Sequence, residues 1–307
     1  MNNKYKDDFI WFKGTIMPYG EAQINIMNTS AQYGINVFEG IRCYYDEKNQ
    51  QLFAFKPYEH LERLLSSAKL LRLELKPHIT IDYLIKGIQD VINANNLRED
   101  LYVKIGVFID DEGSWSAFGP TGIYILAFPK GRVFPDKKGL NCCISSWQRI
   151  SDSAVSPRIK SGANYINSRY GYLEAQMNGY DSTIFLNNNG KVSEGPGACI
   201  FMVRKGKLIT PSITSSILES ITRKSIIEIA QNELNIQVEE RDVDRTELYI
   251  ADELFFVGTS IEIVPILSVD QHVIDDNIGR LTSQLRGLFY NIVMNKKEKY
   301  NNWLTKL

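Results

Sequence analysis

The sequence predicts an α+β protein of two domains. Short β-type stretches joined by hairpin turns recur in both halves, amphipathic helices lie between groups of strands, and a run rich in Pro, Gly and Lys divides the chain. Strands that pair in hairpins, with helices packed outside them, are typical of α+β proteins rather than of doubly wound parallel sheets. The length of 307 residues also favours more than one domain.

The first half is expected to alternate short strands with two helices. Leu61, Leu64 and Ala68 recur at the three- and four-residue spacing of an amphipathic helix. A second helix is expected after Thr80, because threonine is a preferred N-cap residue and apolar residues follow at helical spacing. The expected strands of this half are residues 10–12, 14–16, 52–55, 102–109 and 123–128.

The second half contains two hairpin signals and two further helices. Asn189-Gly190 and Lys205-Gly206 each lie between two apolar runs, and dipeptides of this kind favour tight hairpin turns. The expected elements are paired strands at 183–186 with 191–192 and at 200–203 with 208–209, a helix from near Thr222, a strand at 253–257 and a helix at 278–294.

A segment of changed composition separates the halves. Residues 129–139 contain two prolines, two glycines and four cations, which is typical of a linker. We therefore expect a smaller N-terminal domain over residues 1–128, an interdomain linker over 129–139, and a larger C-terminal cofactor-binding domain over 140–307.

The composition excludes some classes of function. A net charge of −1 gives no general attraction to nucleic acid or to an anionic membrane. The N-terminus is polar, and apolar runs such as Ile123–Phe128 are far shorter than the ~20 residues that span a bilayer. The four cysteines form no C-x-x-C and the three histidines lie far apart, so we expect buried thiols and no metal site. We expect a cytoplasmic protein.

Lys160, Tyr165 and Glu194 are the residues whose chemistry stands out. Each lies near small, bending residues that let a flat ligand approach the backbone. Together they supply an amine for a Schiff base, a phenol for a ring oxygen and a carboxylate for a ring nitrogen. These are the groups that pyridoxal 5′-phosphate (PLP) requires, so the sequence predicts a PLP site.

Three segments could bind the phosphate of such a cofactor. The run Ser220–Arg223 lies where a helix begins, and helix N-termini favour anions. The run Gly258–Ser260 follows an apolar strand and forms a small hydroxyl-bearing turn. Arg63 lies beside the apolar face of the first helix and can fork onto a phosphate. No Walker A or G-x-G-x-x-G motif is present, so nucleotide binding is not supported.

Several motifs in the same order make the chain resemble the class IV (fold type IV) PLP-dependent aminotransferases, and within them the bacterial branched-chain amino acid aminotransferases. The motifs are the runs 33–42, 60–64, 160–165, 193–195, 221–223, 248–253 and 258–259. The resemblance implies two α/β domains with PLP between them, in a homodimer or a larger homo-oligomer. It also implies ping-pong transamination of leucine, isoleucine and valine with 2-oxoglutarate.

The resemblance further implies a role for each matching residue. Lys160 forms the Schiff base and moves the proton, Tyr165 binds the ring oxygen, and Glu194 pairs with the ring nitrogen. The phosphate ligands are Arg63, Ile221, Thr222 and Thr259. The carboxylate of the substrate is bound by Thr259, Ser260 and Tyr102, and Tyr102 is a residue that a partner subunit could supply. The apolar side chain of the substrate is bound by Phe38 and Tyr33.

The chain departs from the pattern of this family at a few positions. Lys104 stands where an arginine usually helps to bind the side-chain carboxylate of glutamate, and lysine keeps the charge but loses the bidentate fork. The other departures are Lys130 and Val133 in place of an aromatic pair, Gly197-Ala198-Cys199 in place of Gly-Glu-Asn, and Glu219-Ser220 in place of Pro-Gly.

These departures bear on substrate choice and leave alternatives open. One is a class IV aminotransferase for D-amino acids, aromatic substrates or specialised secondary metabolites. Another is a catalytically silent PLP-binding or regulatory protein, against which the intact Lys160 argues. The sequence leaves open the oligomer size beyond a dimer and the physiological direction of the reaction.

Overall fold

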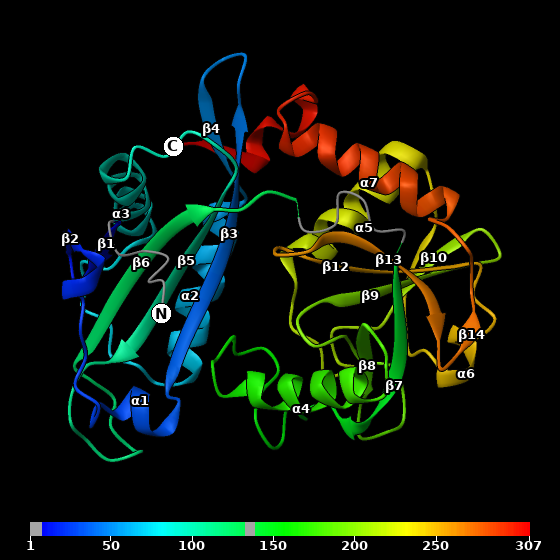
Figure 1. Cartoon of the computed structure of the whole chain (residues 1–307), viewed down its shortest axis with the longest axis horizontal. Helices are drawn as coiled ribbons and strands as arrows, with labels where there is room; N and C mark the ends of the chain where they lie inside the picture. The colour runs from blue at the N-terminus through cyan, green and yellow to red at the C-terminus, as the bar shows by residue number, and fades with distance from the viewer. Residues whose placement is uncertain (1–7, 133–138) are drawn as a thin grey trace. The chain divides into compact units, whose positions relative to one another are not determined.

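The computed structural model describes residues 8–132 and 139–307 (Figure 1). The chain packs into two compact units. The first unit comprises Met1–Gly131, Ile159–Ala163 and Val293–Leu307, and the second comprises Arg132–Arg158 and Asn164–Ile292. Most of the predicted linker, residues 133–138, lies outside the described residues, as does Val133, and the predicted domain bounds stay a prediction.

The first unit is built on a seven-stranded antiparallel sheet. Its strands, in spatial order, are β15 (Leu304–Lys306), β4 (Gln51–Phe55), β3 (Asn36–Asp46), β5 (Leu101–Ile109), β6 (Thr121–Pro129), β1 (Phe9–Phe12) and β2 (Thr15–Pro18). All five strands predicted in this half are confirmed. The long strand β3 overlaps the sequence motif 33–42, but no strand was predicted there. The C-terminal strand β15 was not predicted either.

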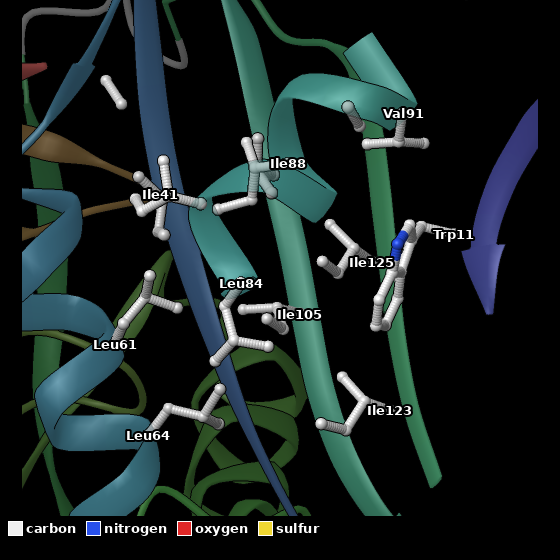
Figure 2. Packing of buried hydrophobic residues seen from close by; sticks show 14 of the residues in the cluster. Trp11, Ile41, Leu61, Leu64, Leu84, Ile88, Val91, Ile105, Ile123 and Ile125 are labelled. Atoms are coloured by element: carbon white, nitrogen blue, oxygen red, sulfur yellow. The ribbon is translucent and has the colours of Figure 1, made fainter. Parts of the chain in front are cut away.

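Two helices, α2 (Pro57–Leu70) and α3 (Ile81–Ala94), cover one face of this sheet (Figure 1). Both helices were predicted, and the Thr80 side chain caps α3 by accepting a hydrogen bond from the Tyr83 N–H. Figure 2 shows the resulting core, in which Leu61, Leu64 and Leu84 from the helices pack against Ile41 and Ile105 from the sheet. The short elements of this unit are α1 (Thr29–Tyr33) and two 3-10 helices, Tyr19–Glu21 and Glu298–Trp303.

The alternation of side chains along β3 gives its two faces different roles. Val37, Ile41 and Cys43 belong to the core beneath the helices. Since successive side chains of a strand point to opposite faces, Phe38 and Gly40 belong to the face away from that core. On β5 the same rule separates Val103 and Ile105, which lie in the core, from Tyr102 and Lys104.

The second unit contains an eight-stranded mixed sheet. Its spatial order is β11 (Val238–Glu240), β10 (Lys207–Thr210), β9 (Cys199–Arg204), β12 (Glu253–Gly258), β13 (Glu262–Val269), β7 (Leu140–Gln148) and β8 (Ser182–Leu186), with β14 (His272–Val273) beside β13. The neighbours β10 and β11, β13 and β7, and β7 and β8 are parallel, and the other pairs are antiparallel. The α+β class is confirmed.

The two predicted hairpins are both present. Lys205 and Gly206, with φ of 51° and 74°, form the left-handed turn that joins β9 to β10. The Asn189-Gly190 turn follows β8 and reverses the chain, so that Val192 pairs with Leu186, the last residue of β8, in a single antiparallel bridge. The second arm of this hairpin is therefore too short to count as a strand.

The described residues of this unit form four helices: α4 (Asn164–Met177), α5 (Ile221–Leu234), α6 (Arg245–Leu248) and α7 (Arg280–Val293). The predicted helices near Thr222 and over 278–294 are confirmed as α5 and α7. In the described parts of the chain, no helix combines the length and the apolar character needed to cross a membrane.

Candidate active site

Lys160 lies on a short segment that hydrogen-bonds to β3 within the first unit. The Lys160 carbonyl accepts from the Phe38 N–H at 2.9 Å, and the Lys160 N–H donates to Ser67 Oγ on α2 at 3.2 Å. A Cβ at Gly162 would lie 2.7 Å from Asn36 Oδ1, so a larger residue here would displace the Asn36 side chain. The segment therefore fixes the Lys160 backbone, and its Nζ lies 5.1 Å from the centre of the Phe38 ring.

Beside Phe38, Glu39 points into the core and organises a buried cluster with α2. Arg63 donates from Nε to Glu39 Oε1 at 2.7 Å and from Nη2 to Oε2 at 3.0 Å, in a bidentate pair. His60 Nδ1 lies 2.8 Å from Glu39 Oε2, and the His60 Nε2 atom is buried without a hydrogen-bond partner. Glu39 thus orients the Arg63 guanidinium by accepting hydrogen bonds from two of the five N–H groups of that guanidinium.

The ionisation of this cluster follows from its contacts. Burial raises the pKa of Glu39, but the Arg63 guanidinium and the His60 hydrogen bond outweigh it and hold that pKa well below its usual range. Burial lowers the pKa of His60 more strongly than Glu39 raises it. The stable form is therefore a carboxylate between a guanidinium and a neutral imidazole.

The face of the sheet away from the helices carries four predicted substrate or specificity residues. Lys104 Nζ lies 5.4 Å from the centre of the Phe38 ring, and Lys130 Nζ lies 4.7 Å from the centre of the Tyr102 ring. A Cβ at Gly40 would lie 1.7 Å from the Tyr102 hydroxyl oxygen, so the phenol occupies the space that glycine leaves. The structure therefore brings Phe38, Lys104 and Tyr102 onto one surface.

A cavity of 740 Å³ opens on this surface within the first unit. Its lining includes Phe38, Phe12, Phe108, Tyr124 and Leu126, which make it predominantly apolar. Lys104 is the one charged side chain among its described lining residues. Burial raises the pKa of Tyr124 to about 12, so its phenol stays neutral. Tyr33 does not line this cavity: it ends α1 and is 47% exposed.

In the second unit, Glu194 is buried and held by Arg149. Arg149 Nε and Nη2 both lie 2.9 Å from Glu194 Oε1, and the Leu218 N–H donates to Oε2 at 3.2 Å. Arg149 also donates to Asn167 at 3.0 Å, which fixes the guanidinium against α4. An adjacent cation favours the charged carboxylate, the form that could pair with a protonated ring nitrogen.

Glycines bring three backbone segments close together near Glu194. A Cβ at Gly195 would lie 2.7 Å from the Phe256 ring, and one at Gly258 would lie 3.3 Å from the Gly197 carbonyl oxygen. Tyr165 lies in the first turn of α4, and its ring lies beside Gly197. A Cβ added at Gly197 would be 3.9 Å from Cε1 of the Tyr165 ring. Thr259 and Ser260 form the turn that follows Gly258.

Ile221 and Thr222 occupy the first turn of α5. The Ser220 side chain caps this helix by accepting from the Arg223 N–H at 3.2 Å, and the first intrahelical bond runs from Lys224 to the Ser220 carbonyl. The N–H groups of Ile221 and Thr222 therefore precede the hydrogen-bonded part of the helix, where an anion is favoured.

These donors fit PLP by their chemistry. Arg63 and the α5 N-terminus suit a phosphate, Glu194 suits a ring nitrogen, and Lys160 supplies a primary amine. Arg149 was missed by sequence reasoning, because its pairing with Glu194 spans 45 residues and has no local signal. Glu39 and His60 lay within quoted motifs, but no role had been predicted for them.

Comparison with known proteins gives the family. Residues 36–269 match the family described as amino-transferase class IV. The chain therefore belongs to the class IV aminotransferases, which are PLP-dependent transferases. The PLP cofactor and the aminotransferase activity predicted from the sequence are thus confirmed.

Within the family, the relatives point to one group. A probable branched-chain-amino-acid aminotransferase of Aquifex aeolicus (strain VF5) is 39% identical over 310 residues, covering 99% of this chain and 98% of that protein. A branched-chain-amino-acid aminotransferase of Escherichia coli (strain K12) is 37% identical over 309 residues, covering 98% of both. The crystal structure of the Thermobaculum terrenum branched-chain amino acid aminotransferase in its PLP form has a TM-score of 0.93 and 40% identity, with 99% of each chain covered.

Proposed function

We propose that this enzyme transfers amino groups between branched-chain L-amino acids (leucine, isoleucine, valine) and 2-oxoglutarate. The observation that carries the proposal is the cavity of the first unit. Its apolar wall suits a branched aliphatic side chain, and Lys104, the one cation of its described lining, suits the second carboxylate of 2-oxoglutarate. The similarity to branched-chain aminotransferases supports the same assignment.

Lys160, Glu194 and Tyr165 are proposed to act on the cofactor. When bound, PLP supplies an electron sink for the bond broken at the substrate α-carbon. The Lys160 amine takes the proton from that carbon and returns it on the cofactor side. Glu194, held as a carboxylate by Arg149, keeps the ring nitrogen protonated, and the Tyr165 hydroxyl binds the ring oxygen.

Arg63, Ile221, Thr222 and Thr259 are proposed to hold the phosphate. Arg63 is directed by its bidentate pair with Glu39, which fixes the orientation of a guanidinium suited to an anion. The α5 N-terminus adds backbone N–H groups and the Thr222 hydroxyl. These groups would hold the phosphate, so that the cofactor would stay in place without depending on its link to Lys160.

The substrate is proposed to lie on the Phe38 surface. Phe38, which lines the cavity, contacts the aliphatic side chain, while Thr259, Ser260 and Tyr102 bind the α-carboxylate. The predicted contact of Tyr33 with the side chain stays a prediction, because Tyr33 does not line this cavity. Lys104 binds the distal carboxylate of 2-oxoglutarate as a point charge, without the forked geometry of arginine. The same pocket therefore accepts an apolar amino acid in one half-reaction and a dicarboxylate in the other.

We further propose a cytoplasmic homodimer or larger homo-oligomer. The four cysteines are buried free thiols, which suits a reducing compartment. The proposal of a homo-oligomer rests on the resemblance to the branched-chain aminotransferases.

A substrate panel tests the proposal. Purified enzyme is supplied with 2-oxoglutarate and with L-leucine, L-isoleucine, L-valine, D-alanine or L-phenylalanine, and glutamate formation is measured. We expect the three branched-chain L-amino acids to give the highest kcat/KM. Activity confined to D-amino acids or aromatic substrates would reject this specificity and favour a class IV aminotransferase of another kind. A lack of turnover with every donor, in enzyme shown to bind PLP, would favour a silent PLP-binding protein.

A further inference from the structure

The Cys199 thiol lies against the second oxygen of Glu194. Residues 194 and 199 face each other across a single β-bridge, closed by a 2.8 Å hydrogen bond from the Gly195 N–H to the Ala198 carbonyl. Cys199 Sγ is 3.8 Å from Glu194 Oε2 and 3.7 Å from the Leu218 carbonyl oxygen. Cys199 and Glu194 are 2% and 3% exposed, so water does not compete for these contacts.

Glu194 Oε2 accepts two hydrogen bonds, one from the Leu218 N–H and one from the Cys199 thiol. The other oxygen, Oε1, accepts from Arg149 Nε and lies 2.9 Å from Arg149 Nη2. A carboxylate oxygen offers about two lone-pair sites, so the two donors at Oε2 already match its capacity. A ring N–H that pairs with Oε2 therefore requires one of these two donors to withdraw.

The thiol is the donor best able to withdraw. Arg149 is pinned by Asn167 and Ser168 as well as by Glu194, and the Leu218 N–H is fixed by the backbone. A thiol is the weakest of these donors, and its hydrogen turns about the single Cβ–Sγ bond. The Leu218 carbonyl offers it a second acceptor at a similar distance.

We propose that Cys199 is a positioning residue for Glu194. Its thiol donates to Glu194 Oε2 in the PLP-free protein, and turns to the Leu218 carbonyl when the ring nitrogen takes its place at the carboxylate. No bond to sulfur forms or breaks, and the thiol proton stays on Sγ throughout. This inference rests on the proposed role of Glu194 as the partner of the ring nitrogen.

The S–H stretching band in the infrared spectrum reports this movement directly. Spectra of the full-length protein are recorded with and without PLP, for the wild type, C199A and C142A. Cys142 is a matched control, because it is fully buried on β7 of the same unit and its thiol forms no hydrogen bond to Glu194 among the described residues. We expect PLP to shift one S–H band in the wild type and in C142A, and to shift none in C199A. An S–H spectrum that PLP leaves unchanged, or a shift that persists in C199A, would overturn the proposal.

Two further measurements separate this inference from the role of Glu194. PLP affinity of E194Q is measured by titration: affinity and absorption equal to the wild type would reject Glu194 as the ring partner, and the Cys199 inference with it. A weakened E194Q together with an unmoved wild-type band would reject the Cys199 inference alone. C199S, which keeps a rotating donor between the same two acceptors, is expected to retain PLP affinity within about threefold, given the modest net strength of such bonds.

Discussion

Two nitrogens of Arg149, Nε and Nη2, both lie 2.9 Å from a single oxygen of Glu194, Oε1. Both side chains are almost fully buried. The pair leaves Glu194 Oε2 to the Leu218 N–H and the Cys199 thiol. A carboxylate in these surroundings is preorganised as an anion, because Arg149 supplies the counter-charge before any ligand arrives.

Replacing Arg149 is expected to destabilise the protein strongly. R149M leaves Glu194 buried without its cation, and breaking a buried pair by removing one partner lowers the free energy of unfolding by about 3–5 kcal/mol. Urea denaturation measures the change. R158M is the matched control, because Arg158 forms a partly exposed pair with Asp152 and Glu219, for which a loss of about 0–1 kcal/mol is expected. Equal losses in R149M and R158M would show that the Arg149 pair has no special weight.

Replacing Glu39 is expected to weaken PLP binding without touching a proposed cofactor ligand. E39Q removes the charge that directs the Arg63 guanidinium, and loss of a charge-assisted hydrogen bond reduces affinity about tenfold or more. Titration of PLP into the apoprotein measures this effect. E59Q, at a half-buried position of the same helix where Glu59 pairs with Lys56 and not with Arg63, serves as the control and should bind PLP as the wild type does. Wild-type affinity in E39Q would contradict the orienting role of Glu39.

Acid is expected to destabilise the protein through His60 and Glu39. The lowered pKa of His60 means that the unfolded chain binds a proton that the folded chain does not, so stability falls as the pH drops below the ordinary histidine value of 6.5. The lowered pKa of Glu39 adds stability above the ordinary value of 4.5 and loses it as the pH falls further.

The two contributions can be separated by substitution. Each proton changes the free energy of unfolding by at most about 1.4 kcal/mol per pH unit. H60Q should make the free energy of unfolding less dependent on pH between pH 6.5 and 5, and E39Q should do the same below pH 4.5. H272Q alters an exposed histidine and should keep the wild-type curve. Identical curves for H60Q and the wild type would show that His60 has no unusual ionisation in the folded state.

Lys104 is expected to control the use of 2-oxoglutarate. K104M removes the one charge of the described cavity lining and should raise the KM for 2-oxoglutarate about tenfold or more, while the KM for L-leucine changes little. K104R restores a forked donor and should lower the KM for 2-oxoglutarate below that of the wild type. K86M alters an exposed lysine on α3 and should leave both values unchanged. An equal rise in the KM for 2-oxoglutarate and for L-leucine in K104M would show that Lys104 does not bind the distal carboxylate specifically.

Much of the fold follows from local sequence signals. The spacing of Leu61, Leu64 and Ala68 predicted α2, and Thr80 marked the start of α3, because both signals depend on residues within one or two turns. Strand β15 was not predicted, because its three residues form a strand only by pairing with β4, some 250 positions earlier. Likewise Ile159–Ala163 packs with the first unit because Phe38 and Ser67 hydrogen-bond to it, which no local pattern records.

The candidate site shows the same division. Lys160, Tyr165 and Glu194 could be selected because their side chains have distinctive chemistry beside small residues. Arg149 could not, because its importance lies in a partner 45 positions away. Cys199 could be noted as a departure from the family pattern, but only its distance from Glu194 Oε2 gives that departure a physical meaning.

Lys160 is the lysine proposed to react with PLP, and borohydride reduction identifies that lysine by fixing the Schiff base covalently. The PLP-loaded enzyme is reduced, digested and mapped by mass spectrometry, with K160A and K104A treated in parallel. We expect one phosphopyridoxyl group, on Lys160, in the wild type and in K104A, and no such group in K160A. A label on Lys104 or another lysine, or a label that survives K160A, would contradict it.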